Sequence, residues 1–260
     1  MTTTIAIAGK GGTGKTTVAA LLIKQLSKQG AVLAIDADPA MNLNMALDLP
    51  LPDTIGGIRE EMAVSVKKGQ FQVGLSKVDY LDLKVTEAVL EGDRIDLLAM
   101  GRPEGPGCYC AANNMLRQII DRISKGYRYV VMDCEAGMEH ISRQTTRDID
   151  VLLLVSDPSL RGIVTAGRMQ ALMGELRTHT GRIGLVVNRV NGDLSPALRE
   201  AIARDKLDLI ATLPADPSLE AIEVRGEPVV NLSESSPLYR AVEDMSNKLG
   251  LGAAQTTSKE

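Results

Sequence analysis

The residues most able to do chemistry form a run of glycines and lysines near the N-terminus, Gly9-Lys10-Gly11-Gly12-Thr13-Gly14-Lys15-Thr16. The run satisfies the phosphate-binding pattern G-x-x-x-x-G-K-[ST] and lies between an apolar stretch and a helical pattern, as that motif requires. Glycines let successive backbone N–H groups approach phosphate oxygens, and the following helix adds the positive end of its dipole. We therefore expect ATP or ADP with Mg²⁺ to be bound by Gly11, Gly12, Thr13, Gly14, Lys15, Thr16 and Thr17.

Two residues of this loop have expected roles of their own. The Lys15 ammonium should contact the β- and γ-phosphates, and the Thr16 hydroxyl should ligate Mg²⁺. A glycine turn that merely joins a strand to a helix is the alternative interpretation.

A second candidate site is the C-x-C pair Cys108 and Cys110, at the end of a loop dense in Gly and Pro (residues 101–110). Two thiolates supply only half of the four ligands that zinc or nickel usually takes. A two-fold dimer with both loops on its axis would supply four, so the pair indicates a metal site between two copies of the chain. Two partly buried thiols without a metal are the alternative. Cys134 is expected to fill the core.

Short apolar runs with the composition of strands alternate with helical stretches along the chain. The runs expected as strands are 3–8, 31–36, 95–100, 129–133, 151–155 and 183–188, and helices are expected after the glycine loop, at 112–124 and at 160–176. Continuously apolar strands are typical of a parallel sheet that helices cover on both faces. The sequence thus predicts a three-layer α/β fold in one domain, residues 1–250, with a disordered tail at 251–260. Residues 47–91 are expected to form irregular insertions over the active face.

The second lysine of the glycine loop carries a resemblance to a known family. With Lys10 directly after the first glycine, GKGGTGKTT resembles the deviant Walker A motif of the MinD-type ATPases, which include the nitrogenase iron protein. In that family this lysine crosses a two-fold interface to the partner's nucleotide. The resemblance implies a three-layer P-loop ATPase fold, an ATP-dependent homodimer, and catalysis that involves Lys10 and Lys15. A solvated loop lysine is the alternative for Lys10.

Three further segments are similar to functional segments of this family. Asp36-Ala37-Asp38-Pro39 resembles the first switch region, which implies that the Asp38 carboxylate orients the attacking water. Asp133 closes an apolar run and resembles the Walker B acid that holds Mg²⁺, although such an acid can be a simple turn former. The positions that resemble the adenine site are Asn188, Pro214 and Asp216, with ordinary polarity at strand ends as the alternative.

The cysteine loop resembles two groups within the family. It is similar to the cluster-binding loop of the nitrogenase iron protein, with Cys108 at the ligand, but His140 stands where that protein has its second cluster cysteine. The C-x-C pair and the stretch DCEAGMEHISR (residues 133–143) instead resemble the CooC-type ATPases, which mature nickel carbon monoxide dehydrogenase, and related acetyl-CoA synthase factors. This implies an ATP-hydrolysing nickel metallochaperone that acts on the apo form of such an enzyme. Its intersubunit site would take nickel or zinc, with an Fe–S cluster as the alternative.

Composition narrows the other possibilities. The 260 residues carry 29 Lys and Arg against 33 Asp and Glu, a net charge of −4, and contain no Trp and one Phe. This balance disfavours nucleic acid as a partner, because both a general positive field and stacking platforms are missing. The C-terminal stretch is too short and polar for a membrane-binding amphipathic helix, so we expect no membrane partner. No window comes near eighteen uninterrupted apolar residues, and the N-terminus lacks the features of a secretory signal, so we expect a cytoplasmic location. The competing interpretations are a MinD/ParA-like positioning ATPase and an electron-donating Fe–S ATPase.

Overall fold

The computed structural model describes residues 1–68, 76–102, 110–134, 148–175 and 179–252. The strands are β1 (Thr3–Gly9), β2 (Val32–Ala37), β3 (Ile95–Ala99), β4 (Tyr129–Cys134), β5 (Asp148–Ser156), β6 (His179–Val190) and β7 (Leu209–Pro214). The helices are α1 (Lys15–Ser27), α2 (Leu43–Ala46), α3 (Ile55–Lys67), α4 (Lys77–Glu87), α5 (Cys110–Ser124), α6 (Leu160–Glu175), α7 (Pro196–Arg204), α8 (Pro217–Arg225), α9 (Pro237–Lys248) and the short 3-10 helix η2 (Val229–Asn231).

The strands form one sheet in the order β3-β2-β4-β1-β5-β6-β7, and each neighbouring pair is parallel. The predicted parallel sheet is therefore confirmed. The strands β2 and β4 are buried along their whole length, and β1, β3, β5 and β6 are buried over most of their apolar residues. Because all strands run the same way, the loops that follow them meet at one edge. The edge strand β7 was not expected from the sequence, and it mixes buried and exposed residues over a short span.

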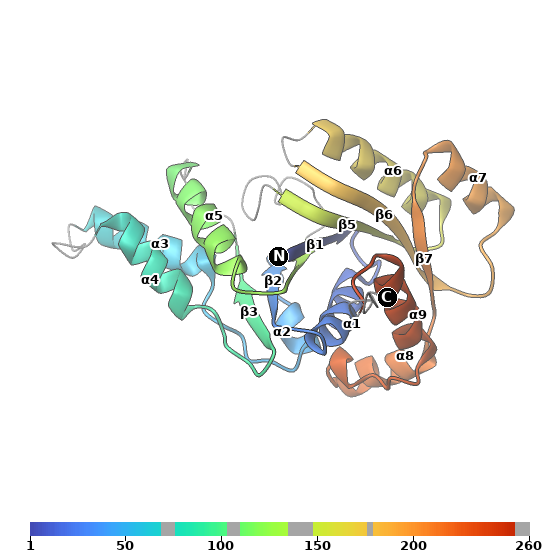
Figure 1. Ribbon diagram of the computed structural model, residues 1–260, viewed down its shortest axis with the longest axis horizontal. Coiled ribbons are helices and arrows are strands. Elements are labelled where there is room, and N and C mark those ends of the chain that lie inside the picture. Colours follow the sequence, from blue (N-terminus) through green and yellow to red (C-terminus); the bar gives the residue numbers. More distant parts are fainter. Residues whose placement is uncertain (69–75, 103–109, 135–147, 176–178, 253–260) are drawn as a thin grey trace, which may run out of the picture.

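Helices cover both faces of the sheet (Figure 1). In β1, Ile5 and Ile7 pack in one core with α1, α2, α8 and α9, whereas Ala6 and Ala8 pack in another with α5, α6 and α7. This alternation follows from the two-residue period of a strand. The small alanines on one face and the branched isoleucines on the other belong to two separate hydrophobic cores, so the predicted three-layer α/β fold is confirmed.

The prediction of irregular structure over residues 47–91 was wrong, because two regular helices lie there. The side chain of Thr54 accepts a hydrogen bond from the N–H of Gly57 and caps α3, and Ser76 caps α4 in the same way through Asp79. Such caps offset the unpaired N–H groups of a helix start. The helices α3 and α4 contact each other, and α4 packs on α5 beside the β3 edge of the sheet (Figure 1). Cap residues in the sequence could have revealed both helices.

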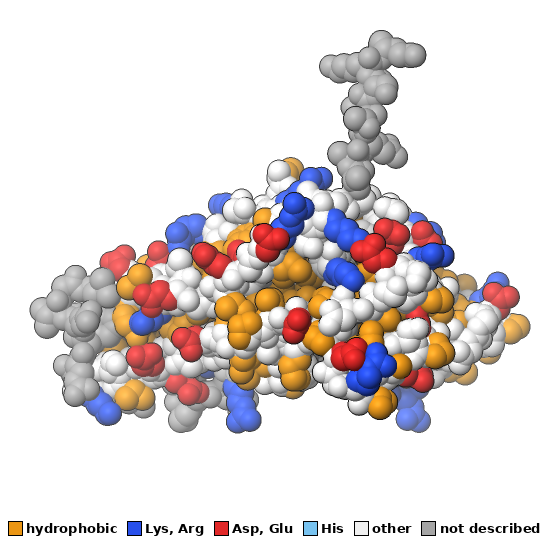
Figure 2. All heavy atoms as spheres, turned by 90° about the horizontal axis from the view of Figure 1, so that it is seen from below, with side chains coloured by type: hydrophobic (Ala, Val, Ile, Leu, Met, Phe, Trp, Pro, Cys, Tyr) orange, Lys and Arg blue, Asp and Glu red, His pale blue; other side chains and the backbone are white. Residues whose placement is uncertain are grey.

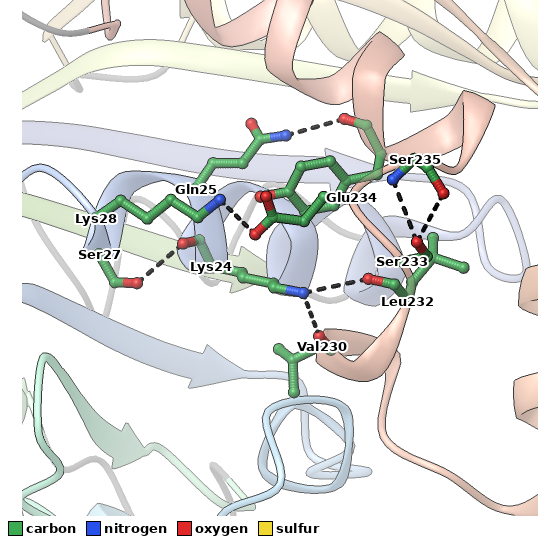
Figure 3. A network of polar contacts seen from close by, with 10 residues as sticks. Lys24, Gln25, Ser27, Lys28, Val230, Leu232, Ser233, Glu234 and Ser235 are labelled. Carbon is green, nitrogen blue, oxygen red and sulfur yellow. Dashed lines mark hydrogen bonds and ion pairs between the residues drawn. The ribbon is translucent and has the colours of Figure 1, made fainter.

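The far end of α1 is held by the chain that precedes α9 (Figure 3). The Lys24 ammonium donates to the carbonyls of Val230, at 2.6 Å, and Leu232, at 3.2 Å. Lys28 forms an ion pair with Glu234, with 2.6 Å between Nζ and Oε1. That exposed pair contributes little, but the two carbonyl contacts position the helix whose first residue is Lys15.

Cationic and anionic side chains are interspersed over the face that Figure 2 shows. This agrees with the small net charge of the whole chain, −4. No helix among the described residues is long and apolar enough to span a membrane. At the C-terminal end, Leu251 is buried, and its carbonyl accepts a hydrogen bond of 3.3 Å from the Tyr129 hydroxyl. Ordered packing thus extends at least one residue into the predicted tail, and residues 253–260 lie outside the described part.

Candidate functional site

The glycine loop joins β1 to α1 at the carboxyl edge of the sheet. Gly14 has a φ of 88°, and a Cβ atom there would lie 2.4 Å from the amide nitrogen of Asn188, so both backbone and space require glycine. The loop borders a cleft of about 410 Å³. The residues that line this cleft, which we call the phosphate cleft, are Gly11, Gly12, Gly14, Lys15, Thr16, Asp38, Asn42 and Arg189.

The two lysines of the loop have different surroundings. Lys15 is 8 % exposed, and its ammonium lies 3.5 Å from the carbonyl oxygen of Lys10. The Thr13 hydroxyl donates to the same carbonyl at 2.9 Å. The Lys10 side chain itself is exposed. This arrangement places Lys15 at the phosphate cleft and leaves the Lys10 side chain at the surface, where a second subunit could reach it.

The predicted magnesium residues lie together. The Thr16 hydroxyl donates a 2.6 Å hydrogen bond to Oδ2 of Asp133, whereas Oδ1 of Asp133 is buried and has no hydrogen-bond partner among the described residues. Burial raises the pKa of Asp133 to about 7, helped by the nearby carboxylates of Asp36 and Asp38 and opposed by the Thr16 bond and the Lys15 charge. A buried, unpaired carboxylate oxygen beside a threonine hydroxyl fits Mg²⁺ or its water shell, which would supply the missing positive charge.

Asp36 controls the shape of the loop that carries Asp38. Its carboxylate accepts hydrogen bonds from the backbone N–H groups of Asp38, at 3.1 Å, and Leu43, at 2.9 Å, and so joins the two ends of the loop. Burial raises the pKa of Asp36, although both backbone bonds oppose the shift. Asp38 lines the phosphate cleft, and its Oδ1 accepts from the Ala40 N–H at 2.8 Å. No role was expected for Asp36 from the sequence alone. The signal that could have indicated one is an acidic residue at the end of an apolar strand.

A second pocket of about 240 Å³ lies next to the phosphate cleft. We call it the base pocket, and its lining residues are Thr17, Asn188, Arg189, Pro214, Ala215, Asp216, Leu219, Glu220, Glu223 and Leu238. It brings together the predicted adenine positions from two separate segments, Asn188 from β6 and Pro214 with Asp216 from the end of β7 and its link to α8. Taken together, the base pocket and the phosphate cleft are comparable in size with small-molecule sites, which occupy roughly 300–1,000 Å³.

Asn188 contacts the glycine loop directly. Its amide nitrogen donates to the Thr13 carbonyl at 2.9 Å, and its oxygen accepts from the backbone N–H of Arg189 at 2.9 Å. The side chain is 4 % exposed. Its amide group therefore supports the glycine loop, and the second N–H and the second lone pair are left for a base.

Asp216 caps α8 and fastens the start of α9. Its carboxylate accepts from the Ser218 N–H at 2.8 Å, the Ser236 hydroxyl at 2.5 Å and the Leu238 N–H at 3.2 Å. Burial would raise the pKa of Asp216, but these hydrogen bonds together outweigh it, and the net shift is downward. Asp216 thus fixes the wall of the base pocket. The pair Asp216-Pro217 is a helix-start signal that could have indicated the cap of α8, whereas the contacts with Ser236 and Leu238 have no local signal.

The cysteine loop lies mostly outside the described residues. Cys108 and His140 are outside them, and for Cys110 the structure describes the backbone, at the first residue of α5, but not the side chain. Within the described ranges, no group of three or more His, Cys, Asp and Glu could hold a metal ion. Cys134 is fully buried in the core and its Sγ lies 3.8 Å from the Met132 carbonyl, as expected for a core residue. Burial raises the pKa of its thiol, which makes it a poor nucleophile.

The geometry of the glycine loop, Thr16 and Asp133 is that of a phosphate-loop ATPase. Comparison with known proteins shows to which family of such ATPases the chain belongs. Residues 4–229 match the family described as the CobQ/CobB/MinD/ParA nucleotide binding domain, CbiA, so the chain belongs to that family. The resemblance to MinD-type ATPases is thereby confirmed, and the protein is an ATPase.

Among its relatives is an uncharacterized ATP-binding protein of Methanocaldococcus jannaschii, 42 % identical, with 94 % of this chain and 97 % of the relative covered. The carbon monoxide dehydrogenase accessory protein CooC of Rhodospirillum rubrum is 32 % identical over 88 % of this chain and 90 % of its own. The septum site-determining protein MinD of Pyrococcus horikoshii, solved with Mg-ADP, has a TM-score of 0.68 at 22 % identity and 96 % coverage of both chains. At that identity the likeness to MinD concerns the fold.

Proposed function

We propose that this protein is an ATP-driven nickel metallochaperone that works as a homodimer in the cytoplasm, on the apo form of carbon monoxide dehydrogenase or acetyl-CoA synthase. Nickel is its cargo and is held by Cys108 and Cys110 of both subunits. The similarity to CooC, 32 % identity over 88 % of the chain, supports this proposal, as does the C-x-C spacing. We assign residues 1–250 to one ATPase domain.

The observation that carries the proposal is the position of Asp36 between the nucleotide and the cysteine loop. Its carboxylate holds the Asp38 loop, and its backbone carbonyl accepts a 2.8 Å hydrogen bond from the N–H of Met100, where the chain leaves β3 toward Cys108. The Asp38 loop and the chain that follows β3 are therefore both hydrogen-bonded to one residue of β2. A change in the Asp38 loop on hydrolysis would act directly on the base of the loop that carries the cysteines.

The chemistry of hydrolysis follows from the residues around the phosphate cleft. Lys15 and the N–H groups of the glycine loop stabilise charge on the transferred phosphoryl group, and Thr16 with Asp133 holds Mg²⁺. Asp38 positions the attacking water. Lys10 adds a further positive charge from the partner subunit, so that hydrolysis requires the dimer.

A dimer also explains how the nucleotide controls the metal. Four thiolates brought close together repel one another, and a divalent cation offsets that repulsion. If ATP closes the two subunits and ADP lets them separate, the distance between the two C-x-C pairs changes, and the affinity for nickel changes with it. By linkage, nickel must then also alter the affinity for ATP.

The proposal is tested by nickel titration of the protein with and without ATP, with molecular mass measured by light scattering in the same samples. We expect about one nickel ion per dimer, with an affinity that depends on the nucleotide. The double variant Cys108→Ser, Cys110→Ser should lose that site, and Cys134→Ala, which changes a buried core thiol, is the matched control. Equal nickel binding by the double variant and the wild type would overturn the assignment.

An Fe–S cluster on the same cysteines would make the protein an electron donor instead. The C-x-C pair of a dimer could supply the four thiolates that such a cluster needs. An absorption spectrum of anaerobically purified protein separates the two cases, because iron–sulfur clusters absorb visible light strongly and a nickel-free or zinc-loaded site does not.

A further inference from the structure

Arg189 is the penultimate residue of β6. It lies where the phosphate cleft and the base pocket meet and lines both of them. Its side chain is exposed, and Nη1 of its guanidinium donates to the carbonyl of Gly12 at 3.1 Å. Arg189 therefore presents a positive charge at the junction of the two compartments.

The backbone of Arg189 supports a functional role. Its φ is 58°, in the left-handed region that glycine and asparagine adopt at lower cost than arginine. The hydrogen bond from its N–H to the Asn188 side chain holds this conformation. Strained residues of this kind concentrate at ligand sites, where the surrounding structure offsets their cost.

We propose that Arg189 binds the α-phosphate of the nucleotide. The inference rests on the proposed placement of the phosphates at the glycine loop and the base beside Pro214. A nucleotide that spans the two compartments must place its ribose and α-phosphate at the junction. Of these two groups, only the α-phosphate carries the negative charge that a guanidinium binds. A guanidinium has five N–H donors, of which the bond to Gly12 uses one, so several remain for phosphate oxygens.

This role has a consequence that separates Arg189 from the lysines of the loop. ATP, ADP and AMP all carry an α-phosphate, so Arg189 stabilises the three complexes alike. Lys15 contacts the β- and γ-phosphates, so removal of its charge should discriminate among them. Arg189 then helps to retain ADP after the γ-phosphate has left, together with Lys15 at the β-phosphate.

The test compares Arg189→Lys and Arg189→Gln with the wild type by calorimetry with Mg-ADP and a slowly hydrolysed ATP analogue, and by competition with AMP. Neither substitution relieves the backbone strain, and glutamine keeps a donor for the Gly12 carbonyl. We expect glutamine to weaken the binding of all three nucleotides by about tenfold, and lysine by less, because charge-assisted hydrogen bonds to phosphate are about twice as strong as neutral ones. Arg204→Ala, an exposed arginine on α7, is the control.

Two results would overturn the inference. Wild-type affinity in Arg189→Gln would show that the residue only braces Gly12, and a loss confined to the ATP analogue would place the guanidinium at the γ-phosphate. Lys15→Ala tests the underlying site separately. If Lys15→Ala binds Mg-ADP like the wild type, the placement of the nucleotide fails; if it binds weakly while Arg189→Gln binds normally, only the role of Arg189 fails.

Discussion

The Thr16 hydroxyl lies 2.6 Å from a carboxylate oxygen of Asp133, although 117 residues separate the two in the chain. They meet because β4 pairs with β1 in parallel, with Asp133 beside Ile7. The same strand also pairs with β2 and places Asp36 beside Asp133. Three segments thus contribute to one buried polar site at the carboxyl edge of the sheet.

The Asp133→Asn substitution should abolish the Mg²⁺ dependence of nucleotide binding. Asparagine keeps an acceptor for the Thr16 hydroxyl but removes the negative charge that Mg²⁺ or its water shell requires. We expect ATP turnover to fall at least about 100-fold, since metal ions stabilise the charge of the transferred phosphoryl group. Steady-state turnover and calorimetry at several Mg²⁺ concentrations measure both effects. Unchanged Mg²⁺ dependence would assign the metal to other ligands.

The raised pKa of Asp133, about 7, predicts how stability depends on pH without metal or nucleotide. Between the ordinary value of 3.8 and about 7 the folded protein holds a proton that the unfolded chain has lost. The contribution of Asp133 to the free energy of unfolding is therefore present in acid and is lost as the pH rises, by at most about 1.4 kcal/mol per pH unit.

Urea unfolding in EDTA at pH 5, 6, 7 and 8 measures this dependence. Asp133→Asn cannot titrate, so its stability relative to the wild type should increase across the series. Asp36 titrates in both proteins, so its contribution to the pH dependence cancels when the two free energies of unfolding are subtracted. A constant difference between the two proteins would show that Asp133 keeps an ordinary pKa.

The Asp38→Ala variant should bind ATP and hydrolyse it about 100-fold more slowly, because positioned proton acceptors contribute roughly 10²–10⁴ in rate. A slow variant should accumulate as the ATP-bound dimer. Asp38→Asn is the matched comparison, because its amide oxygen can still accept the bond from Ala40 and only the charge is lost. Phosphate release is the measurement. Wild-type turnover in both variants would assign the water to another group.

Replacing Lys10 by alanine should leave the monomer folded and prevent ATP-dependent dimerisation. The Lys10 side chain is exposed, and the hydrogen bonds at this residue involve its carbonyl, which alanine retains. Light scattering with and without a slowly hydrolysed ATP analogue measures the mass. Lys77→Ala, at the exposed start of α4, is the control. A Lys10→Ala protein that still dimerises with ATP would remove the cross-subunit role.

Asp216→Asn should destabilise the protein by about 2 kcal/mol at pH 7, because an amide has one acceptor oxygen where the carboxylate has two. Either the Ser218 bond to Oδ1 or the Ser236 and Leu238 bonds to Oδ2 are then lost in a buried setting. Because the pKa of Asp216 is lowered, its contribution is present above the ordinary carboxyl pKa and is lost as the pH falls through the folded value. Urea unfolding at pH 7 and below pH 4 should show the difference narrowing in acid. Asp193→Asn, with a side chain 97 % exposed, should change stability little at either pH.

The sequence predicted most of the sheet because its strands are continuous apolar runs. The observed strands begin and end within a few residues of the predicted positions. It failed for α3 and α4. In α3 the buried residues Ile55, Ile58 and Met62 are spaced three and four residues apart, as on one face of a helix, but the glycines and charged residues between them obscure this pattern. It also missed β7, a short strand with mixed burial. Where tertiary packing supplies most of the stability of a helix or strand, the local sequence predicts that helix or strand only weakly.

By itself, the sequence determined the phosphate loop, its two lysines and the acids that close strands, because each signal lies in adjacent residues with a fixed spacing. Only the tertiary structure decided that Asn188 supports Thr13 from 175 residues away, that Asp216 holds the start of α9, and that Arg189 lies between two pockets. These contacts depend on the order of strands in the sheet. Strand order follows from the packing of the whole core and the crossovers between strands, which no local spacing encodes.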